Sequence, residues 1–183
     1  MTKEALLIID MLNDFVREGA PLEVPATRDI IPSIRREIET ARREGRPIIY
    51  VCDTHAPDDR EFSKFGWPRH AVKGTEGAQV IEALKPERDD IIIEKTTYSG
   101  FYQTKLEETL KQFGIRHLIL TGCVTHICIL FTASDAVLRD YWVTVPEDCV
   151  AGLAKEDHDA ALRIMQNVLG VQVLRVNEPA VSR

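Results

Sequence analysis

The chain has 183 residues, which is the size of one ordinary protein domain. Hydrophobic residues make up 44% of it and charged residues 28%, so extended disorder and a membrane protein are both disfavoured. The formal net charge is -6, and no basic tract offers a surface for phosphate groups, which disfavours nucleic-acid binding. We therefore expect a single domain over residues 1–183 that binds neither nucleic acid nor a membrane.

Alternating strands and helices are predicted along the whole chain. The strands are short, nearly continuous apolar runs, which is typical of strands that are buried on both faces of a parallel sheet. The helices carry an apolar stripe with a period near 3.6 residues. The expected elements, in chain order, are a strand at 5–9, a helix at 30–44, strands at 47–52 and 90–94, a helix at 104–113, a strand at 117–121, a helix at 125–139, a strand at 142–145, a helix at 155–169 and a strand at 172–175.

Several helix boundaries are marked by specific residues. Thr104 and Glu107 have the spacing of a capping box, which predicts a helix start. Gly45, Gly114 and Gly170 follow apolar stripes and are expected to end helices. The alternation predicts a doubly wound α/β fold, with a six-stranded parallel sheet covered by helices on both faces as a three-layer sandwich.

Charged or reactive residues follow four of the predicted strands. Ligands of such sheets bind beyond the carboxyl ends of the strands. Nucleotide-binding motifs are absent from the sequence, because it contains neither G-x-G-x-x-G after the first strand nor G-x-x-x-x-G-K-[ST]. The residues at the strand ends are Asp10, Asp53 with His55, Lys95 and Cys123.

The cysteines predict a reduced protein with one reactive thiol. No C-x-x-C pair occurs and the N-terminus lacks the features of a signal peptide, so we expect reduced thiols in the cytoplasm. Cys52, Cys123 and Cys149 are interpreted as core residues. Cys128 differs because it lies in the first turn of a predicted helix, where the helix dipole lowers a thiol pKa.

A nucleophilic thiol needs a base, and two strand-end residues can assist it. Asp10 follows the first strand, which is central in the common doubly wound order, so it is expected to lie near Cys128. Lys95 supplies a cation that can hold the carboxylate and stabilise the thiolate. Backbone N–H groups at the helix start can receive the oxyanion of an acyl-transfer step.

Three segments that contain these residues resemble the isochorismatase-like cysteine hydrolases, over essentially the whole chain. They are LLIIDMLNDF at 6–15, KTTYSGF at 95–101 and TGCVTHIC at 121–128. The resemblance implies a triad with Asp10 as base, Lys95 as its electrostatic partner and Cys128 as nucleophile. It also implies a cis peptide bond between Cys123 and Val124, and an oxyanion hole made by the N–H groups of Val124 and Cys128.

Asp53, His55 and His70 form a set of one carboxylate and two imidazoles, which suits Zn²⁺ or a similar divalent ion. The segment WPRHAVKGT at 67–75 resembles the W-P-x-H-C-V-x-G-T segment of nicotinamidases, whose metal ligands match these three residues.

The same resemblance implies a substrate pocket. Phe15 and Trp67 match the aromatic residues that sandwich a pyridine ring, and Tyr98 is expected in the pocket wall. Three departures from nicotinamidases are present. No further histidine follows in residues 56–61, the segment between Lys95 and Tyr98 is short, and His126 replaces an aspartate.

The preferred function is therefore a cysteine-dependent amidohydrolase that releases ammonia from a small carboxamide, with nicotinamide as the preferred substrate. A carbamoyl or ureido amide hydrolase of the same family is the first alternative. A non-catalytic binding or thiol redox-sensing protein is the second. Relatives commonly form dimers or tetramers, so a homo-oligomer is expected. His117 and His158 are interpreted as structural or solvated residues.

Overall fold

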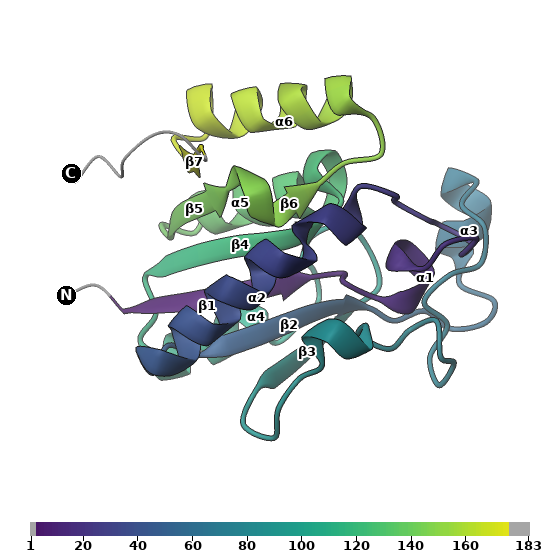
Figure 1. Cartoon of the computed structure of the whole chain (residues 1–183), viewed down its shortest axis with the longest axis horizontal. Coiled ribbons are helices and arrows are strands. Elements are labelled where there is room, and N and C mark those ends of the chain that lie inside the picture. The colour runs from purple at the N-terminus through teal and green to yellow at the C-terminus, as the bar shows by residue number, and fades with distance from the viewer. Residues whose placement is uncertain (1–2, 176–183) are drawn as a thin grey trace.

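The computed structural model describes residues 3–175 and contains one parallel sheet. The order of its main strands is β3-β2-β1-β4-β5-β7, and the short β6 pairs with β4 (Figure 1). All strand pairs are parallel, as the apolar runs predict. The strands are β1 (Glu4–Ile9), β2 (Ile48–Asp53), β3 (Ile91–Lys95), β4 (His117–Cys123), β5 (Trp142–Pro146), β6 (Val150–Ala151) and β7 (Gln172–Leu174).

The four predicted helices are present, and two short helices were not predicted. The helices are α1 (Asn13–Val16), α2 (Thr27–Arg43), α3 (Arg60–Phe65), α4 (Leu106–Phe113), α5 (Leu130–Val137) and α6 (Lys155–Asn167). A π-helical turn at Thr125–Ile129 leads directly into α5. Short 3₁₀ turns lie at Glu82–Leu84 and Glu147–Cys149.

Alternate residues of the central strand β1 face two separate apolar layers. Leu6 and Ile8 pack with α2 on one face, and Leu7 and Ile9 pack with the layer that contains α4, α5 and α6 on the other. In Figure 1, α2 crosses in front of the sheet and α4 lies behind it. The two-sided burial explains why β1 has no polar alternation, and the doubly wound three-layer fold predicted from the sequence is confirmed.

Two local predictions need correction. The strand β6 was not predicted, because its two residues are too few to show a pattern. The capping box is only half formed: Thr104 Oγ1 accepts a hydrogen bond from the Leu106 N–H group, but Glu107 pairs with Lys111 and Arg139 instead of reaching back to the helix start. Ion pairing with two cations competes with the reciprocal cap.

The carboxyl ends of the central strands meet at one edge of the sheet. The short helices α1 and α3 lie beyond this edge, at the right of Figure 1. Each follows a central strand in the chain, α1 after β1 and α3 after β2. Among residues 3–175, the structure contains no helix of the length and apolarity needed to cross a bilayer.

Candidate active site

Lys95 lies between the carboxylates of Asp10 and Asp53 at this edge. Lys95 Nζ is 2.8 Å from Asp10 Oδ2, contacts Asp53 Oδ1, and donates to Cys128 Sγ over 3.5 Å. All four residues are buried. The two carboxylates raise the pKa of Lys95 by more than burial lowers it, so the ammonium group stays charged. The structure thus brings the three residues of the predicted triad together.

Asp10 is held in an uncommon backbone conformation. Its φ angle is +53°, and its Oδ1 accepts a hydrogen bond of 2.8 Å from the Asp53 N–H group. Burial and the nearby negative charge of Asp53 raise the pKa of Asp10 to about 6, although Lys95 opposes them. A carboxyl group with such a pKa can both accept and return a proton near neutral pH.

The expected low pKa of the Cys128 thiol is contradicted. Burial raises the pKa of Cys128 well above its ordinary value, and Asp10 and Asp53 raise it further, against the lowering effect of Lys95. We expected the helix start to lower this pKa by more than other groups raise it. However, the two negative charges of Asp10 and Asp53 oppose a thiolate, and Lys95 supplies only one positive charge. Burial and the two carboxylates therefore disfavour the thiolate, so the reaction of Cys128 needs a nearby proton acceptor.

The chain reaches Cys128 through a turn that follows β4. The peptide bond between Cys123 and Val124 is cis, and the π-helical turn starts at Thr125. The Cys123 side chain is fully buried and its thiol donates to the Asp10 carbonyl group over 3.2 Å. N–H groups in the first turn of a helix lack intrahelical partners, so the backbone from Val124 to Cys128 can offer donors to an oxyanion.

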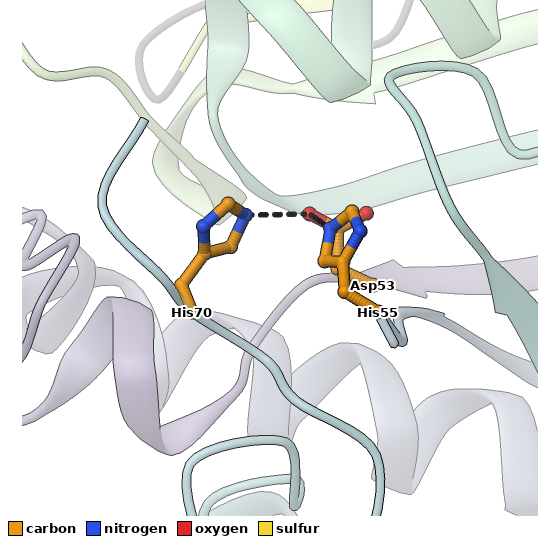
Figure 2. A group of neighbouring side chains, drawn as sticks. All are labelled: Asp53, His55 and His70. Carbon is orange, nitrogen blue, oxygen red and sulfur yellow. Dashed lines mark ion pairs between the residues drawn. The ribbon is translucent and has the colours of Figure 1, made fainter. Parts of the chain in front are cut away.

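Asp53, which contacts Lys95, also faces two imidazoles. Figure 2 shows how the side chains of Asp53, His55 and His70 converge. The Nε2 atoms of both imidazoles lie 3.8 Å from Asp53 Oδ2. Ligand atoms at about 2.0–2.2 Å from a tetrahedral zinc ion lie roughly 3.4 Å apart, which is close to this spacing. The carboxylate oxygen and the two ring nitrogens are all within 4.8 Å of one another.

Hydrogen bonds at the far side of each ring orient the two imidazoles. His55 Nδ1 lies 3.1 Å from Asp59 Oδ2, and His70 Nδ1 lies 2.7 Å from the Pro68 carbonyl oxygen. Both partners accept, so each Nδ1 carries a proton, and each Nε2 faces Asp53 and offers a lone pair to a metal when the ring is neutral. His55 Nε2 is buried and, within the part of the chain that the structure describes, has no hydrogen-bond partner. These residues therefore fit a divalent metal.

A cavity lies next to Cys128, and Asp53 and His70 form part of its lining. Trp67 Nε1 donates to Tyr98 Oη over 3.3 Å, and the Phe15 ring meets the His70 ring edge-on at 5.5 Å between centroids. All three aromatic residues predicted for substrate binding line this cavity. The full lining is Phe15, Leu22, Val24, Asp53, Glu61, Trp67, His70, Tyr98, Val124, Ile127, Cys128 and Leu153.

Two positions in the site were missed from the sequence. Glu61, on α3, is buried and lines the cavity, and burial followed by the charge of Asp53 raises its pKa. Asp59 caps α3 through the Glu61 N–H group and also holds His55. The only signal for either residue was the run of carboxylates after His55, which is also common in solvated loops.

The loop that carries His70 is attached to α1. Asp14 Oδ2 accepts a hydrogen bond of 2.8 Å from the Ala71 N–H group. A Cβ atom at Gly77 would lie only 2.2 Å from the same Asp14 oxygen, so a side chain here would have to displace the Asp14 carboxylate. Asp14 therefore sets the position of the loop next to His70, while the adjacent Phe15 lines the cavity.

Known proteins resemble this chain over nearly its whole length. The chain is 37% identical over 183 residues to a probable inactive nicotinamidase of Arabidopsis thaliana, a match that covers 95% of this chain and 93% of the relative. The N-carbamoylsarcosine amidase of Thermoplasma acidophilum is 38% identical, with a TM-score of 0.86 and coverage of 98% of this chain and 100% of that one.

A third comparison includes a metal. The pyrazinamidase of Pyrococcus horikoshii, solved in complex with zinc, is 32% identical with a TM-score of 0.88, and the match covers 94% of this chain and 99% of that one. The Isochorismatase domain family matches residues 4–178. The chain therefore belongs to the isochorismatase family of hydrolases.

Proposed function

We propose that this protein is a cysteine-dependent amidohydrolase that converts a small carboxamide to a carboxylate and ammonia, and that nicotinamide is its preferred substrate. The observation that carries the proposal is the position of Asp53. Its Oδ1 contacts Lys95, which also touches Asp10 and Cys128, and its Oδ2 faces His55 and His70. Asp53 thus connects the proposed nucleophile and its base to the possible metal ligands His55 and His70. Cys128, Asp53 and His70 all line the same aromatic cavity.

The proposed reaction has two stages. Asp10 accepts the Cys128 thiol proton as the sulfur attacks the carbonyl carbon, and the Val124 and Cys128 N–H groups stabilise the oxyanion. The C–N bond then breaks, and Asp10 gives the proton to the departing ammonia. In the second stage Asp10 removes a proton from water, which attacks the thioester, and the C–S bond breaks to regenerate the thiol. Lys95 holds the Asp10 carboxylate throughout.

Asp53, His55 and His70 would hold a divalent metal, with Zn²⁺ best suited to this ligand set. When bound, the metal would supply a Lewis acid that holds a ring nitrogen of the substrate. Phe15 and Trp67 would contact the faces of a pyridine ring and Tyr98 would close one side of the cavity, which directs the carboxamide toward Cys128.

The charge of the cavity favours nicotinamide over the carbamoyl and ureido acids. N-carbamoylsarcosine carries a carboxylate, which needs a cation in its site. The described lining contains no lysine or arginine, and it contains Asp53 and Glu61. Lys95 lies beneath the cavity between Asp10 and Asp53, so its charge is already paired. The proposed metal would be the one cation facing a substrate in this lining, and if it holds a ring nitrogen, no charged partner is left for a carboxylate, which supports a neutral amide.

The non-catalytic alternative rests on one relative, since the Arabidopsis protein is named as a probable inactive nicotinamidase. A binding or redox-sensing protein has no need of a base and a cation beside its thiol, whereas Asp10 and Lys95 both lie at Cys128. The mechanism requires a reduced thiol, which is why we place the protein in the cytoplasm. A dimer or tetramer remains our expectation for its assembly.

The test is a nicotinamide deamidation assay with and without a chelator. It uses the wild-type protein, Cys128→Ala and His70→Ala, with N-carbamoylsarcosine as second substrate. We expect ammonia release from nicotinamide to need Cys128 and to fall on chelation and in His70→Ala. Faster turnover of N-carbamoylsarcosine, unaffected by chelator, would support the first alternative. An absence of turnover with ready oxidation of Cys128 would support the second.

A further inference from the structure

His158, on α6, contacts the turn that leads to Cys128. Its Nδ1 atom lies 2.9 Å from Thr125 Oγ1, and the two groups share a hydrogen bond. Thr125 is fully buried and lies between Val124 and Cys128, the residues whose N–H groups are proposed to hold the oxyanion. The contact joins positions 33 residues apart in the chain. A side chain interpreted from the sequence as structural or solvated therefore touches the reactive turn.

The segment that precedes α6 in the chain lies alongside this turn. Val150 and Ala151 in β6 pair with Gly122 and Cys123 at the end of β4. A Cβ atom at Gly152 would lie 2.9 Å from His158 Cβ and 3.4 Å from His126 Nδ1, so glycine permits both histidines to approach.

Next in the chain, Leu153 lines the cavity above Cys128. The segment 150–158 thus lies alongside the turn, from the end of β4 to the cavity.

Packing of α6 against the core limits the movement of His158. It has 13 residues, and Leu162 and Met165 are buried in the core layer that also contains Cys128. His158 lies near the start of the helix and is half-buried, so its ring position is set by packing of the helix. A buried hydroxyl that is bonded to a group on such a helix has little freedom to move.

We propose that His158 is a positioning residue for the oxyanion hole, acting through the Thr125 hydroxyl group. The inference rests on the proposed amidase function. The hydrogen bond fixes the backbone between Val124 and Cys128, and donors for a developing oxyanion act well only when their positions are set before the reaction. A displacement of about 1 Å near reacting atoms can reduce a rate by about 100-fold.

The experiment compares variants that remove or keep the hydrogen bond. His158→Leu and Thr125→Val remove it, whereas His158→Asn and Thr125→Ser keep a polar group near the same place. Gln166→Ala, on the exposed side of the same helix, is the matched control. We expect kcat for nicotinamide to fall about 10- to 100-fold in the first pair with KM changed less than about threefold, and to recover largely in the second pair.

A second measurement separates positioning from folding. Pyridine-3-carboxaldehyde is the probe, and we expect its carbonyl carbon to form a bond with Cys128 Sγ, while the C=O π bond becomes an oxyanion and the thiol proton passes to Asp10. Its affinity should fall in parallel with kcat in His158→Leu, whereas the melting temperature and the rate of Cys128 alkylation by iodoacetamide should change little. Non-additive losses in the double variant His158→Leu/Thr125→Val would support direct coupling.

The proposal is overturned if His158→Leu keeps the wild-type kcat and aldehyde affinity. It is also overturned if the asparagine and leucine variants lose activity equally and in proportion to melting temperature, since that pattern indicates packing alone. If wild-type protein hydrolyses no amide, the proposed function fails. The aldehyde affinity then still tests the role of His158, because that measurement needs only the thiol and the oxyanion hole.

Discussion

Asp53 and Lys95 are partners in the parallel register of β2 and β3, and their side chains form an ion pair at the carboxyl ends of those strands. The register therefore delivers a carboxylate and an ammonium group to one point from positions 42 residues apart. Burial raises the pKa of Asp53, but Lys95, together with His55 and His70, lowers it by more, so the carboxylate stays ionised. An anionic Asp53 can hold Lys95 and a metal at once.

We expect Asp59→Asn to weaken zinc binding by about 10- to 100-fold, because Asp59 holds the Nδ1–H group of His55. Zinc affinity can be measured by competition with a chromogenic chelator on the apoprotein. The control is Asp58→Asn, an exposed carboxylate one position away. Alkylation of Cys128 by iodoacetamide should be the same in both variants. Equal zinc affinity in the two variants would show that Asp59 does not support the metal site.

Lys95→Met should destabilise the fold by about 3–5 kcal/mol, since it leaves the buried carboxylates of Asp10 and Asp53 facing each other without a cation. The exposed pair between Lys73 and Glu94 provides the control, and Lys73→Met should cost less than about 1 kcal/mol. Urea unfolding at neutral pH measures both. A loss of stability for Lys95→Met no larger than the control contradicts the buried ion-pair arrangement.

One thiol should react with small alkylating agents in the folded protein. All four cysteines are buried, but Cys128 alone among them lines the cavity. Mass spectrometry after iodoacetamide treatment should find a single adduct, at Cys128, and none in Cys128→Ala. Cys149→Ala should keep wild-type labelling and ammonia release. Labelling at Cys52 or Cys149 before Cys128 would argue against the cavity as the route to the nucleophile.

Gly122→Ala should destabilise the protein by about 3–5 kcal/mol. The φ angle of Gly122 is +108°, and an added Cβ would lie 2.0 Å from the Ile9 carbonyl oxygen, so β4 would have to move away from β1. Gly170 also has a positive φ, +68°, but open space around it, so Gly170→Ala should cost only about 1 kcal/mol. Thermal unfolding of both variants provides the comparison, and equal losses would refute the packing argument.

The strand-end residues of the site could be predicted from the sequence. Asp10, Asp53 and Lys95 follow or end buried strands, and parallel neighbours carry such ends to one edge. The position of Cys128 near Asp10 could also be predicted, because β4 pairs with β1 and a helical turn begins directly after β4. These relations depend on the order and direction of strands, which apolar patterns indicate well.

Other features depend on loop paths and on summed charges. Asp59 reaches His55 only because the loop turns back at α3, and His158 reaches Thr125 only where α6 packs. The thiol pKa of Cys128 was predicted in the wrong direction, because the helix start is local in sequence whereas the opposing effects of burial, Asp10 and Asp53 are not. A linear pattern contains no information on that balance.

The hydrogen bond between Asp14 and the Ala71 N–H group connects the aromatic wall of the cavity, at Phe15, to the loop that carries His70. Asp14 precedes Phe15 and Ala71 follows His70, so a displacement of Asp14 acts on both segments. Any side chain at position 77 would push Asp14 away from Ala71. The Phe15 ring and the His70 imidazole would then both change position. We therefore expect substrate selectivity and metal affinity to change together on substitution of Gly77, although this residue belongs neither to the cavity lining nor to the possible metal ligands.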